Sequence, residues 1–158
     1  MGFLFDPARL QPMGSASQLD FKKWFDRLQP QTLQIATWLL YLNAFFALVD
    51  WLGNDPGSWI GFARYRDGAL GSLVGLGIVV AYVAGGFLMA NDRRLGWRIA
   101  VVAAFSPFLL RFWVLRDTFA STWDKLTGGR IISVMFEVAL CALLLHPQSR
   151  EHQRVWYR

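Results

Sequence analysis

Four long stretches of apolar residues constrain this chain more than any other feature of its sequence. They cover residues 33–52, 69–90, 95–115 and 131–146. An α-helix rises about 1.5 Å per residue, so about 20 apolar residues cross the ~30 Å hydrocarbon core of a bilayer. We therefore predict an all-α integral membrane protein, a four-helix bundle that forms one domain over all 158 residues.

Composition favours lipid over water as the solvent of these blocks. Hydrophobic residues make up 54% of the chain and charged residues only 17%, whereas soluble domains carry about 25% charged residues. The last block is the weakest predicted span, because its apolar run from Ile131 to Leu145 is short. It spans only if the flanking Arg130 and His146 extend toward the headgroups or the bilayer thins locally. A re-entrant segment is the alternative.

Positive charge predicts the orientation of the spans. Four spans put the N-terminal segment 1–30, the loop between the second and third spans and the tail 147–158 on one side. That side carries Arg9, Lys22, Lys23, Arg27, Arg93, Arg94, Arg98, Arg150, Arg154 and Arg158, and the other side carries Arg64, Arg66, Arg116, Lys125 and Arg130. Because Lys and Arg are enriched in cytoplasmic loops, we predict a multi-pass protein of a plasma (bacterial inner) membrane with both termini in the cytoplasm.

The segment before the first span is predicted to contain a short amphipathic helix over residues 17–29. Ser17 fits an N-cap and Pro30 ends the helix. The apolar stripe of this helix consists of Phe21, Trp24, Phe25 and Leu28. Together with its basic residues, the stripe favours a position in the headgroup layer, in contact with anionic lipids. Packing on the soluble surface of a partner is the alternative.

Small residues recur along the second block and predict close helix packing. They are Gly71, Gly75, Gly77, Ala81 and Gly85. Such residues let a neighbouring helix approach backbone to backbone. The pattern favours packing within the bundle, and a docking face for another membrane protein is the alternative.

Pro107 lies in the middle of the third block and predicts a kink. Proline has no amide proton, so the carbonyl of Ala103 loses its helical hydrogen bond. The preceding Ser106 can compensate with its hydroxyl group. A static kink is favoured over a gating hinge.

Three ionisable residues from three predicted spans lie at similar depth in the outer half of the membrane. Arg111 is about 6 Å and Glu137 about 9 Å from the outer ends of their helices, and Asp50 lies near the outer end of the first span. An isolated charge there costs at least about 2.5 kcal/mol. We therefore expect Glu137 to pair with Arg111, with Asp50 as an alternative or shared acid. A structural pair is favoured over contact with a partner subunit and over a proton or ion relay.

Other chemistry-bearing residues give no catalytic, cofactor or metal site. The only cysteine, Cys141, lies within an apolar run, so no intrachain disulfide forms. His146 and His152 lie at or beyond the inner end of the fourth block, too far from mid-membrane for haem ligation between helices. The pI near 9.9 reflects positive charges that flank apolar blocks, which suits lipid headgroups and not nucleic acid.

The leading functional hypothesis is a non-catalytic accessory or assembly subunit of a larger membrane complex, of the respiratory or envelope-biosynthesis type. The small-residue stripe and the basic termini motivate it as contacts for other membrane subunits. A small oligomeric transporter or channel that uses Arg111 and Glu137 is the first alternative. A lipid-modifying membrane enzyme with Glu137 as its acid is the second.

Overall fold

The computed structural model describes residues 19–25, 29–53, 58–117, 121–127 and 130–157. In this part of the chain every regular element is an α-helix. The helices are α1 (Gln31–Gly53), α2 (Trp59–Asp67), α3 (Ala69–Ala90), α4 (Arg94–Val114), α5 (Thr122–Thr127), α6 (Ile131–Leu145) and α7 (Pro147–Trp156).

Three of these helices, α1, α3 and α4, are long and apolar enough to cross a membrane. The pair α6 and α7 gives a fourth candidate if the two helices, bent by 51°, count as one span. The described part of the chain is thus all-helical, with three or four candidate spans. Each long helix begins and ends within two residues of its predicted apolar block.

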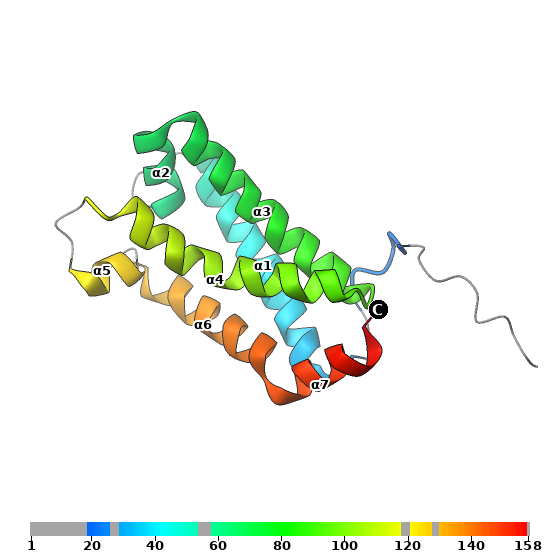
Figure 1. Ribbon diagram of the computed structural model, residues 1–158. Coiled ribbons are helices and arrows are strands. Elements are labelled where there is room, and N and C mark those ends of the chain that lie inside the picture. Colours follow the sequence, from blue (N-terminus) through cyan, green and yellow to red (C-terminus); the bar gives the residue numbers. More distant parts are fainter. Residues whose placement is uncertain (1–18, 26–28, 54–57, 118–120, 128–129, 158) are drawn as a thin grey trace, which may run out of the picture.

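The long helices lie side by side and bring both described chain ends to one end of the molecule (Figure 1). There the N-terminal segment and the C-terminus both contact the turn between α3 and α4. Lys23 forms a 3.0 Å ion pair with Asp92, and Arg94 donates a hydrogen bond to the carbonyl of Tyr157. The short helices α2 and α5 lie at the opposite end (Figure 1).

The small residues of α3 make close contacts within the chain. A Cβ added to Gly71 would lie 2.1 Å from the carbonyl oxygen of Ala63 in α2. A Cβ added to Gly85 would lie 3.0 Å from the backbone of Ala100 in α4. Glycine therefore permits two neighbouring helices to approach the α3 backbone at these positions.

Other members of the predicted stripe differ in their surroundings. Gly75 packs against Ile60 of α2, whereas nothing lies within 4 Å of a Cβ added to Gly77. Ala81 is half-buried. Much of the stripe is thus covered by the chain itself, and Gly77 is the member left on the surface.

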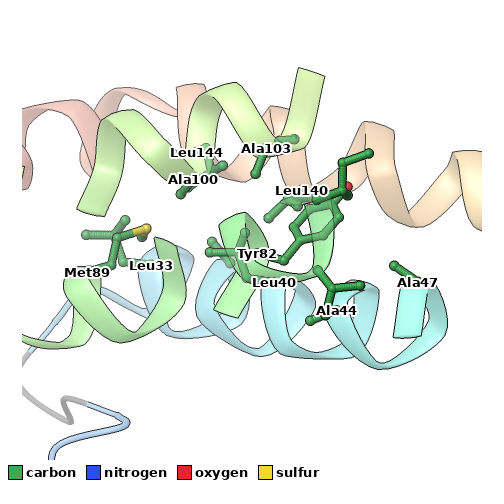
Figure 2. Packing of buried hydrophobic residues seen from close by; sticks show 14 of the residues in the cluster. Leu33, Leu40, Ala44, Ala47, Tyr82, Met89, Ala100, Ala103, Leu140 and Leu144 are labelled. Atoms are coloured by element: carbon green, nitrogen blue, oxygen red, sulfur yellow. The ribbon is translucent and has the colours of Figure 1, made fainter. Parts of the chain in front are cut away.

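An apolar core runs along the bundle between its helices (Figure 2). Its members with no exposed surface come from four helices: Leu33, Ala36, Leu40, Met89, Ala100, Ala104, Leu140 and Leu144. The buried hydroxyl of Thr37 donates to the carbonyl of Leu33 in the same helix, so it adds no polar path to this layer.

Residues 19–25 do not form the predicted interfacial helix. Asp20 donates its amide to the side chain of Asn91, whose amide group donates to the carbonyl of Lys23. These long-range bonds replace helical ones, so the segment turns against the end of α3. Phe21 and Trp24 contact Phe87, while Phe25 contacts Trp38 and Tyr41. Leu28 lies outside the described residues.

The helix α6 ends at Leu145 because Pro147 follows two residues later. His146 is extended, with φ −56° and ψ 141°, the conformation that a following proline favours. Pro147 then begins α7, a helix within the predicted tail 147–158. Ser149 fixes the bend by donating a 2.7 Å hydrogen bond to the carbonyl of Leu143.

Candidate functional site

Helical periodicity brings Arg111 and Glu137 to the inner faces of α4 and α6. Arg111 follows Ala103, Ala104 and Pro107 on the buried stripe of α4. Glu137 shares the buried stripe of α6 with Leu140 and Leu144, at spacings of three and seven residues. Residues at these spacings share one helix face, so both charged groups point into the bundle.

The predicted pair between these two residues is present. Arg111 Nη2 lies 2.5 Å from Glu137 Oε1. The two side chains are only 2% and 7% exposed. The Arg111 guanidinium also lies 6.0 Å from the ring centroids of both Trp59 and Phe108, a distance at which aromatic rings attract a cation.

Asp50 does not share this pair and forms one of its own. Its Oδ1 lies 2.8 Å from Arg130 Nη1, and these side chains are 18% and 39% exposed. Arg130 directly precedes α6, so it lies about 10 Å along the helix axis from Glu137. The prediction of Asp50 as an alternative or shared acid for Arg111 is therefore wrong, because Arg130 provides a nearer cation at the C-terminal end of α1.

A cavity of about 220 Å³ lies between the two ion pairs. Its lining includes both pairs together with Asn43, Tyr82, Thr127 and Ser133. Within the described part of the chain, Glu137 Oε2 is buried and has no hydrogen-bond partner, although its other oxygen is paired with Arg111. At about 30 Å³ per molecule, the volume equals that of about seven waters.

The short helix α2, which was not predicted, borders the cavity at the end far from the chain termini. Ser58 caps the helix by accepting a 3.0 Å hydrogen bond from the Gly61 amide, which places Trp59 over the cavity. Arg64 ties α2 to α1 by donating to the carbonyl of Trp51. A serine before two large apolar residues, Trp59 and Ile60, was the available signal for this helix start.

A second basic residue fixes α2 to α4. Arg66 donates to the carbonyl of Val114 and lies 5.4 Å from the ring centroid of Trp113. It also pairs with the adjacent Asp67 at 2.9 Å. The hydrogen bond from Arg66 lowers the pKa of Asp67 below its ordinary value of 3.8.

Pro107 lies buried beside the cavity, and α4 continues through it. The Ser106 hydroxyl donates a 2.9 Å hydrogen bond to the carbonyl of Ala103, the group that the proline leaves without a helical donor. The Cys141 thiol approaches the next carbonyl, that of Ala104, at 3.6 Å. Side chains thus compensate for the missing backbone bond at this position.

The site offers a buried carboxylate oxygen, hydroxyl and amide groups, and aromatic rings. Such a set suits a small molecule that donates hydrogen bonds. Among the described residues, no group of three or more His, Cys, Asp or Glu side chains is placed to hold a metal ion. Comparison with protein families, curated proteins and solved structures gives no match for this chain.

Proposed function

We propose that this chain binds a small polar molecule in the cavity between its two ion pairs. The observation that carries the proposal is Glu137 Oε2, a buried carboxylate oxygen that borders about 220 Å³ of space and has no hydrogen-bond partner in the part of the chain that the structure describes. Leaving a buried acceptor unsatisfied costs about 1–3 kcal/mol, and more for a charged group. A bound molecule that donates a hydrogen bond to this oxygen removes that cost.

The proposal includes a four-span bundle of a bacterial inner membrane with both termini in the cytoplasm. Support comes from the excess of Lys and Arg on the terminal side and from the two described ends, which lie at the same end of the molecule. The 15 residues of α6 rise only about 22 Å. The bilayer therefore thins beside α6, and the cavity lies in the outer half of the membrane.

Transport through a single copy of the chain has less support than binding. Below the cavity, the core residues Leu40, Leu140 and Leu144 are fully buried. They form an apolar layer between the cavity and the cytoplasmic end, and such a layer gives an ion no polar partners. The proposed role is therefore binding from one side of the membrane.

Thermal unfolding of the detergent-purified protein tests the binding role. Ethanolamine, glycerol, acetate and phosphate serve as soluble probes. A probe that fills the cavity raises the Tm of the wild-type protein, because a ligand at 100 times its Kd stabilises the folded state by about 2.7 kcal/mol. Ala47→Leu, which narrows the cavity without changing its charges, abolishes the increase.

The matched control is Ala142→Leu, the same substitution on the exposed face of α6. It leaves the response to the probe unchanged. If all four probes leave the wild-type Tm unchanged, or if Ala47→Leu responds as the wild type does, the binding role is wrong.

A non-catalytic accessory or assembly subunit is the second candidate, favoured by the exposed face of α7. Only Ser149 of this helix is buried, whereas Val155 and Trp156 are largely exposed at the cytoplasmic end. Such a face suits a neighbouring subunit or lipid headgroups. Gly71 and Gly85 give less support than expected, because α2 and α4 cover them.

Gentle detergent extraction followed by identification of associated proteins tests this candidate. Co-purification with a defined set of membrane subunits, lost when Val155 and Trp156 are both changed to Ser, supports it. A monodisperse protein of one subunit type contradicts it and leaves the binding role as the only candidate.

A further inference from the structure

Each end of the cavity holds one ion pair, and a different group is available to a ligand at each end. At the deep end, Glu137 Oε2 is a buried acceptor without a hydrogen-bond partner among the described residues. At the outer end, the Arg130 guanidinium is 39% exposed beside Asp50. A ligand with a positive group at one end and a negative group at the other matches this order of charges, since oppositely charged groups form the strongest hydrogen bonds.

Aromatic side chains also favour a cation in this cavity, where the Trp59 ring centroid already lies 6.0 Å from the Arg111 guanidinium. Trp59, Tyr82 and Phe136 all line the cavity. The faces of such rings attract a cation within about 6 Å. A primary ammonium group also donates hydrogen bonds, whereas a quaternary ammonium group has no proton to give to Glu137 Oε2.

One wall of the cavity continues onto the outside of the bundle. Phe46 of α1 and Ile132 of α6 line the cavity, yet they are 49% and 72% exposed. In a membrane these exposed side chains contact lipid. The cavity therefore reaches the acyl-chain region between α1 and α6, below the Asp50–Arg130 pair that joins the same two helices.

Building on the proposed binding role, we propose that the ligand is a primary-ammonium zwitterion, the headgroup of an ethanolamine phospholipid from the outer leaflet. The ammonium group donates to Glu137 Oε2, and the phosphate lies toward Arg130. The acyl chains remain outside against Phe46 and Ile132. The cavity, with room for about seven waters, matches a phosphoethanolamine group in size.

Lipid binding to the purified full-length protein tests this inference. Native mass spectrometry and thermal unfolding in detergent are carried out with phosphatidylethanolamine, phosphatidylcholine and phosphatidylglycerol of the same acyl chains. Glycerophosphoethanolamine is the soluble source of the same headgroup. We expect phosphatidylethanolamine to bind at least tenfold more tightly than the other two lipids. Glu137→Gln removes this preference, whereas Glu151→Gln on the exposed surface of α7 preserves it.

The outcomes separate the ligand from the binding role. Equal binding of the three lipids, or a preference that survives both Glu137→Gln and Ala47→Leu, overturns the inference. If glycerophosphoethanolamine raises the Tm as much as the lipid does, the ligand is a soluble zwitterion, which overturns the lipid source but supports the binding role. If Glu137→Gln does not fold, Ala47→Leu decides, because it narrows the cavity and keeps the carboxylate.

Discussion

Removing one member of the Arg111–Glu137 pair is expected to destabilise the protein strongly. Arg111→Met leaves Glu137 without its partner at a position where the pair is almost fully buried. Two charges about 4 Å apart attract each other by about 4 kcal/mol at an effective dielectric constant of about 20. Loss of one partner of a buried pair costs about 3–5 kcal/mol, and at 2% and 7% exposure solvent screening reduces this little.

A double-mutant cycle measures the coupling between the two residues. Glu137→Met alone costs a similar amount, whereas the double change to Met leaves no unpaired charge and costs at most about 1 kcal/mol. The assay is reversible unfolding in mixed detergent micelles, followed by helical circular dichroism. If the costs of the single changes simply add in the double variant, the two residues do not act as a pair and the reasoning is refuted.

The Asp50–Arg130 ion pair provides a control within the same chain. Asp50→Asn and Arg130→Gln remove a pair of similar length, at 2.8 Å, that is 18% and 39% exposed. Because solvent weakens exposed pairs, each change is expected to cost less than about 1 kcal/mol. A cost as large as that of Arg111→Met would show that exposure does not govern the strength of these pairs.

Two further predictions concern α2 and its contacts. Gly71→Ala is expected to destabilise the protein by about 1–3 kcal/mol, since its Cβ would meet the Ala63 carbonyl. Gly77→Ala is expected to be neutral or stabilising by up to about 1 kcal/mol. Thermal unfolding measures both variants, and equal effects of Gly71→Ala and Gly77→Ala would contradict the prediction. Arg66 lowers the pKa of Asp67 in the folded state. The pair therefore stabilises the fold at pH values above 3.8, the ordinary pKa of the carboxyl group. This stabilisation is lost as the pH falls through the lower pKa that Asp67 has in the folded protein. Asp67→Asn therefore reduces the loss of Tm between pH 6 and pH 3, and an unchanged loss would refute the assignment.

Span length and charge depth predicted the main features of the bundle. Apolar length alone placed α1, α3 and α4, because a helix that crosses a bilayer needs about 20 apolar residues. The Arg111–Glu137 pair followed from the cost of an isolated charge and from the direction of each span. Both arguments depend on the cost of placing apolar or charged groups in water or lipid, and neither requires the tertiary contacts to be known.

Features that depend on tertiary contacts were not predictable in the same way. Within the helix predicted over residues 17–29, the Asp20 amide and the Lys23 carbonyl bond to Asn91, which is distant in sequence. The Asp50–Arg130 pair depends on where Arg130 lies, directly before α6. The helix α2 covers Gly71 and borders the cavity, and its short sequence carries no span signal. Periodicity identifies the face of a helix, but the partner of that face comes from the whole fold.

The account depends most on α6 crossing the membrane as a fourth span. In a Cys141→Ser background, single cysteines at Tyr65 in α2 and at Val155 in α7 are both well exposed. Labelling with a membrane-impermeant maleimide in intact spheroplasts and in inverted vesicles reports the side of each residue. With α3, α4 and α6 between them, Tyr65→Cys reacts only from outside and Val155→Cys only from inside. Reaction of both from the same side would show that α6 does not span, and the proposed topology would be wrong.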